Sequence, residues 1–183
     1  APRLGDRITV IGAGVVGCLI ARLAGKLPGC RVQVLDVDAA KATVAAHLGA
    51  AFAAPEQAEG DQDVLIHASG SPAGLATALS LAGFEATVVE ASWFGMQPVS
   101  LPLGEDFHVK RLCLRSSQVS HIATAQRSRW TDQRRMATVM RLLDDPAMDA
   151  LISGESRFAD LPQVMAALSP SATGVLCQRI AYS

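Results

Sequence analysis

The segment RITVIGAGVVG at residues 7–17 joins an apolar, β-branched run to a turn that contains three glycines. The run predicts a buried strand, and the residues after the turn are apolar at helical spacing. In a unit of this kind, Gly12 allows the tight turn, Gly14 lets the backbone approach a pyrophosphate, and Gly17 lets the helix pack closely on the strand. We therefore predict a dinucleotide site, with the pyrophosphate on the backbone N–H groups of the helix start at Val15.

A second predicted strand, residues 31–35, ends on Asp36, which lies about 20 positions beyond Gly17. A carboxylate at this place accepts hydrogen bonds from the ribose of the adenosine. The alternative is a chance glycine turn followed by a surface aspartate, but strand, turn, helix, strand and acid occur here in the expected order. Lys41 stands in the first turn of the next predicted helix, where the helix dipole disfavours a cation. It is either solvated or faces something negative or hydroxyl-rich, and we expect Asp36 and Lys41 to flank the same ribose.

These motifs predict an α/β fold, a Rossmann-type doubly wound parallel sheet with helices on both faces, and the composition agrees with it. Half of the 183 residues are hydrophobic and only 18% are charged, as expected for strands that are covered on both sides. The net charge of −1 gives no reason to expect a nucleic acid or a membrane as partner. No apolar run approaches the ~20 residues of a membrane span. The four cysteines form no CxxC pair and have no histidine at ligand spacing, which predicts no metal site and free thiols in the cytoplasm.

Residues 63–68 predict another buried strand, and Ala68 and Ser69 follow at its carboxyl end, the edge where open α/β sheets bind ligands. Ser71 is expected to cap the next helix, with Pro72 at its first position. His67 has no carboxylate near it in the sequence, so we expect a packed or capping side chain and not a base.

The remaining chain is less regular. Gly83 is expected to close the helix, and residues 86–91 predict a strand that brings Glu90 to the same edge. Residues 99–103 alternate like an edge strand, which suits a contact between two copies of the chain in a homodimer. We expect residues 1–118 to form the dinucleotide-binding domain. Residues 119–183, with an amphipathic helix, a last helix and a closing strand, would complete it.

The order of these motifs resembles the C-terminal, cofactor-binding half of the medium-chain dehydrogenase/reductase superfamily, the zinc-type alcohol dehydrogenase relatives. The glycine turn, the strand end at 35–38, the helix end at 48–50 and residues 63–70 carry the resemblance. It implies that Asp36 and Lys41 contact the ribose, that Val16 lies behind the nicotinamide, and that the backbone of Ala68 and Ser69 lies near the cofactor.

The resemblance also implies hydride transfer between NAD(H) and a small alcohol or carbonyl substrate. NADP is less favoured, because its 2′-phosphate would meet the carboxylate of Asp36. In this family zinc and the proton-relay residues belong to an N-terminal catalytic domain that no part of this chain matches. The residues 119–183 would contact that domain, and this chain alone would bind cofactor without chemistry. The family usually has a glycine where this chain has Glu90-Ala91-Ser92.

Two other functions remain open at this point. One is a nucleotide-sensing Rossmann module without catalysis. The other is an S-adenosylmethionine-dependent methyltransferase, which also uses a glycine turn and an acid after the second strand; the GxGxxG spacing disfavours it.

Overall fold

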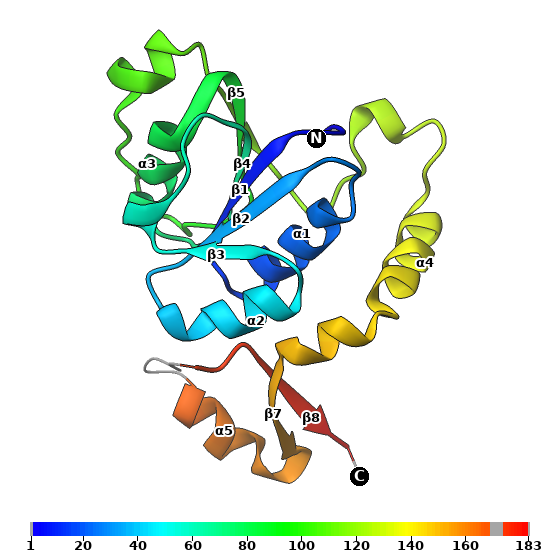
Figure 1. The fold of residues 1–183 in the computed structure, drawn as a ribbon. Helices are drawn as coiled ribbons and strands as arrows, with labels where there is room; N and C mark the ends of the chain where they lie inside the picture. Colours follow the sequence, from blue (N-terminus) through cyan, green and yellow to red (C-terminus); the bar gives the residue numbers. More distant parts are fainter. Residues whose placement is uncertain (1, 169–173, 183) are drawn as a thin grey trace.

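The computed structural model describes residues 2–168 and 174–182. Its main feature is a six-stranded parallel sheet with the strand order β3-β2-β1-β4-β5-β6 (Figure 1). The strands are β1 (Arg7–Ile11), β2 (Arg31–Leu35), β3 (Ala51–Ala53), β4 (Gln62–His67), β5 (Ala82–Glu90) and β6 (Cys113–Ser116). This order confirms the predicted Rossmann-type fold.

Helices cover both faces of the sheet, because successive residues of a strand point to opposite sides. Ile8 and Val10 of β1 belong to the apolar cluster that includes α1 (Val15–Gly25) and α2 (Ala42–His47). Ile11 belongs to the cluster of α3 (Pro72–Leu81) on the opposite face. Both faces of the central strands are therefore covered, whereas the edge strand β6 is exposed.

Two glycines fix the turn between β1 and α1. Gly12 has φ +104°, and a Cβ there would lie 2.8 Å from the backbone nitrogen of Ser69. A Cβ on Gly17 would overlap the carbonyl oxygen of Gly12. Only glycine fits at either position, so the turn can pass close to the end of β4 while α1 packs on β1.

A smaller unit follows the sheet. It contains α4 (Asp132–Leu143), β7 (Ile152–Arg157), α5 (Leu161–Leu168) and β8 (Cys177–Ala181), and β7 pairs with β8 in parallel. Short helical turns lie between these elements: Ala39–Lys41, Pro55–Gln57, Leu103–Phe107, Thr124–Gln126, Pro146–Leu151 and Phe158–Asp160. The strand β7 was not predicted.

One carboxylate joins the smaller unit to the sheet. Asp145 precedes the turn Pro146–Leu151, and its Oδ2 accepts hydrogen bonds from Arg22 Nη2 at 2.9 Å and from Lys26 Nζ at 2.7 Å. Both cations belong to the α1 region. Together they hold the pKa of the Asp145 carboxyl at about 2, the Lys26 bond being the larger cause.

Two local expectations are wrong. The helix α3 ends at Leu81 and β5 begins at the next residue, so Gly83 lies in the strand and does not close the helix. Residues 99–103 form no strand, because Pro98 and Pro102 lack the N–H that a ladder needs, and the edge is β6 instead. The homodimer contact was expected from a strand at residues 99–103, and the structure has no strand there to support it. Ser71 stands at the cap position of α3 with Pro72 first in the helix, as expected, although the Ser71 side chain makes no capping hydrogen bond.

No helix among the described residues is long and apolar enough to cross a membrane.

Candidate functional site

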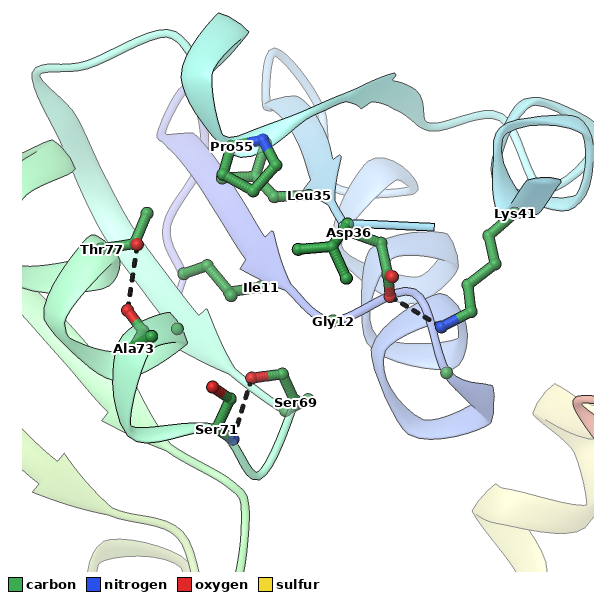
Figure 2. A pocket seen from close by; sticks show the side chains of 14 residues that line it. Ile11, Gly12, Leu35, Asp36, Lys41, Pro55, Ser69, Ser71, Ala73 and Thr77 are labelled. Atoms are coloured by element: carbon green, nitrogen blue, oxygen red, sulfur yellow. Dashed lines mark hydrogen bonds and ion pairs between the residues drawn. The ribbon is translucent and has the colours of Figure 1, made fainter. Parts of the chain in front are cut away.

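A cavity of about 500 Å³ lies at the carboxyl ends of β1, β2 and β4 (Figure 2). It brings together six of the nine predicted binding residues: Gly12, Gly14, Asp36, Lys41, Ala68 and Ser69. The other three, Val15, Val16 and Gly17, belong to α1 and do not line it. The start of α3 closes the cavity on the far side.

The cavity occupies a particular place in the topology. The strand β1 pairs with β2 on one side and with β4 on the other, so the chain reverses its direction of travel across the sheet here. The helices that follow β1 and β4 leave toward opposite faces, which opens a crevice between them. In open parallel sheets this switch point is the usual place for a ligand.

Asp36 is part of the cavity wall. Its Oδ2 accepts hydrogen bonds from Ala13 N at 2.8 Å and from Lys41 Nζ at 2.9 Å. Its Oδ1 accepts one from Asp38 N at 2.9 Å. Burial raises the pKa of the Asp36 carboxyl, but the bonds from Asp38, Lys41 and Ala13 outweigh this, so the pKa lies below its ordinary value. The group is therefore a carboxylate at neutral pH.

The hydrogen bonds of Asp36 limit what it can still accept. A carboxylate has about four acceptor positions, and three are used within the chain. One position on Oδ1 remains. The Lys41 ammonium keeps further N–H donors, since one of its three is directed at Asp36. The pair can thus accept from one ligand hydroxyl and donate to another. Of the two alternatives for Lys41, the structure selects the one with a negative neighbour.

Gly14 leaves the helix start accessible. It is the residue before α1, with φ −77° and ψ −178°, and nothing lies within 4 Å of the place where its Cβ would be. The first N–H groups of a helix have no partner within it. The backbone at Gly14 thus leaves these donors open, and the pyrophosphate contact there stays a prediction.

A buried chain of hydrogen bonds borders the cavity. His67, the last residue of β4, is 0% exposed, and its Nδ1 lies 2.7 Å from Glu90 Oε2. Its Nε2 lies 2.7 Å from Ser69 Oγ, which reaches the cavity wall. The ring also stacks on Phe94, with ring centroids 5.8 Å apart.

His67 is packed, as expected, but it does have a carboxylate partner, Glu90, which was not expected from the sequence. Glu90 stands 23 positions away in the sequence, yet it is the neighbour of His67 in the register of β4 and β5. Each residue stands one position before the end of its predicted strand, 63–68 or 86–91, and the ends of adjacent parallel strands meet. The sequence does not show that these two strands are adjacent, so the pairing follows only from the register.

Nothing among the described residues resembles a metal centre. No three His, Cys, Asp or Glu side chains gather closely enough to hold an ion there. The four cysteines are unpaired thiols, of which Cys18 is buried.

No family model and no curated protein matches the sequence. Solved structures do match the fold. L-idonate 5-dehydrogenase from Escherichia coli K-12 superposes with a TM-score of 0.77 at 21% identity, over 98% of this chain and 51% of that one. A protein of Sinorhizobium meliloti 1021 described as a zinc-binding dehydrogenase, bound to NADP, gives 0.79 at 21% identity, over 98% and 53%.

A third match is a protein of E. coli CFT073 described as a short chain alcohol dehydrogenase, complexed with NADH, with a TM-score of 0.74 at 18% identity, over 98% and 52%. The chain thus spans about half the length of the structures that it matches. It has the fold of one half of the zinc-type alcohol dehydrogenases, as the resemblance in sequence implied.

Proposed function

We propose that this chain binds NAD(H) and is the cofactor-binding part of an alcohol dehydrogenase-like oxidoreductase. The observation that carries the proposal is the cavity at the switch point, where Asp36 with Lys41 and the open backbone at Gly14 lie on one wall. These groups match the two polar parts of the adenosine half, a ribose with hydroxyls and a pyrophosphate. Relatives in fold were solved with NADH and with NADP.

The residues present fit such a cofactor. The carboxylate of Asp36 accepts from a ribose hydroxyl, Lys41 donates to its neighbour, and the helix start of α1 holds the pyrophosphate. When bound, the nicotinamide supplies the hydride that is exchanged with an alcohol or carbonyl carbon. The substrate groups and any zinc would come from a separate catalytic domain, which residues 119–183 would contact. This chain alone is then expected to bind without turnover.

We further propose that NAD(H) is preferred over NADP(H). A 2′-phosphate near Asp36 would meet a like charge and lose a hydrogen bond to a charged group, worth about 1.5–3 kcal/mol. Lys41 offsets this only in part, because its ammonium is already paired with Asp36 at 2.9 Å. The next residue, Val37, is 90% exposed and offers no phosphate ligand.

The test is a fluorescence titration of the chain with NADH and with NADPH. We expect NADH to bind at least about tenfold more tightly, the fold-change of 1.4 kcal/mol. Absence of binding by both nucleotides would refute the proposed function. Equal or tighter binding of NADPH would refute only the role given to Asp36.

A further inference from the structure

The hydrogen bonds that join Ser69, His67 and Glu90 beside the cavity run in one direction, because each group donates to the next. A carboxylate can only accept, so Glu90 Oε2, 2.7 Å from His67 Nδ1, requires the proton on Nδ1. The other nitrogen of a neutral ring is then an acceptor. The Ser69 hydroxyl, 2.7 Å from that Nε2, must therefore donate its proton to His67. Ser92 Oγ also approaches Nδ1, but at 3.3 Å, so Glu90 is the stronger partner.

The direction decides what Ser69 can offer to a ligand. Its hydrogen is directed at His67, and Ser71 N donates to one lone pair of its oxygen at 3.2 Å. One lone pair remains, and Ser69 lines the cavity. A serine in water can donate or accept, whereas this one can only accept from the cavity.

We propose that Glu90 and His67 fix Ser69 as an acceptor-only group that recognises a hydroxyl of the bound nucleotide, which makes Ser69 a specificity-determining residue. The inference rests on the proposed function, because it assigns a further contact within the same cavity. Asp36 and Ser69 then face the ligand as two acceptors, which suits a sugar with hydroxyls and disfavours a phosphate at either place. Glu90 and His67 act as positioning residues, since neither lines the cavity.

The structure offers a way to reverse this polarity without touching the cavity. Glu90 Oε1 accepts from Ser92 N at 2.6 Å, so in Glu90→Gln the amide oxygen stays there and the NH₂ faces His67 Nδ1. Nδ1 must then accept, and the ring proton moves to Nε2. Ser69 now accepts from His67, and its own hydrogen is directed elsewhere, toward the cavity. One isosteric change thus turns Ser69 from acceptor into donor.

The experiment is a double-mutant cycle in NADH affinity on the whole chain, with Glu90→Gln, Ser69→Ala and the double variant. We expect each single variant to weaken NADH about tenfold, the loss of one hydrogen bond of ordinary strength. The double variant should bind no more weakly than Ser69→Ala. Glu85→Gln is the matched control, because it removes the same charge from the same strand at an exposed pair with Arg111.

A spectroscopic measurement tests the direction of these hydrogen bonds, because it shows which ring nitrogen of His67 carries the proton. ¹⁵N spectra of histidine-labelled protein should show His67 with its proton on Nδ1 in the wild type and on Nε2 in Glu90→Gln. The His67 signal is identified by its loss in His67→Gln. His67→Gln also tests whether an amide can replace the imidazole, because the glutamine side chain can donate to Glu90 and accept from Ser69. It should bind NADH more tightly than His67→Leu does.

The outcomes separate the two proposals. If the wild type binds no NADH, the proposed function fails, and the ligand assignment of Ser69 fails with it. If the wild type binds but Ser69→Ala and Glu90→Gln match it, only the role of Ser69 is wrong. A wild-type His67 protonated on Nε2, or on both nitrogens, would overturn the direction of the chain whatever the affinities. The Ser69→Ala and wild-type arms decide the question even if Glu90→Gln does not fold.

Discussion

Gly14→Val should abolish nucleotide binding in a protein that still folds. The structure has room for the new side chain, since nothing lies within 4 Å of the Cβ position, and φ −77° with ψ −178° is extended backbone that valine adopts. Because glycine has no side chain, the substitution removes no capping hydrogen bond from α1. Valine is a poor residue before a helix, so the folding cost is about 1 kcal/mol. For a chain of this size that lowers Tm by about 2–4 °C.

The cost in binding is larger. Two methyl groups would stand over the helix start, where the pyrophosphate needs the unpaired N–H donors of α1. A hydrogen bond to a charged group is worth about 1.5–3 kcal/mol, so losing two removes at least about 3 kcal/mol, or roughly a hundredfold in affinity.

Calorimetry with NADH measures the affinity and circular dichroism confirms the fold. Gly25→Val is the matched control: it stands at the other end of α1, also with nothing within 4 Å of its Cβ position, and should bind like the wild type. A folded Gly14→Val protein with unchanged affinity would refute the reasoning, and the glycine turn would then be only structural.

Gly17→Ala should fail to fold or lose most of its stability, because the added Cβ would overlap the Gly12 carbonyl oxygen; a native Tm would contradict the packing described. Asp36→Ser should narrow or reverse the preference for NADH over NADPH, chiefly by weakening NADH, and an unchanged ratio in the titration would place the ribose elsewhere. Asp145→Asn should lower Tm at neutral pH. Because the folded pKa of Asp145 is depressed, its contribution is present above the ordinary 3.8 and is lost as pH falls toward about 2. The Tm gap to the wild type should therefore close over that range, and a gap that persists at pH 2 would count against the ion pairs. Elemental analysis of the purified chain should find no stoichiometric zinc, and a full equivalent would show a site that the cysteine spacing does not predict.

Local patterns were sufficient for the elements that build the cavity. The strand predicted at residues 31–35 has the bounds of β2, and the β-branched run before the glycine turn forms β1, because such runs between turn signals mark buried parallel strands clearly. The glycine spacing likewise pointed to Gly12 and Gly14, and both line the cavity. Both glycines lie in one strand–turn–helix unit, although the contact that excludes a Cβ at Gly12 comes from the backbone of Ser69 at the end of β4.

Features that depend on packing between distant segments were not predictable in this way. The strand β7 has the sequence ISGESR, whose half-buried positions are Ile152, Gly154 and Ser156, so it shows no apolar alternation. The partner of His67 comes from another strand, and its identity follows only from the register of β4 and β5. Val16 was assigned to the cofactor by resemblance, and the structure places it on α1 with 56% of its surface exposed, outside the cavity.

The position of β1 in the sheet has a consequence for biosynthesis. β1 leaves the ribosome before β4 (Gln62–His67), which is one of its two neighbours in the sheet. Until that segment emerges, β1 has an open edge, and the apolar groups of Val64 and Ile66 are missing from the core cluster around it. A nascent chain that stops before Gln62 therefore leaves one edge of β1 unpaired. Stalled or truncated products of this kind would display the apolar edge of β1, which makes them substrates for chaperones or prone to aggregation.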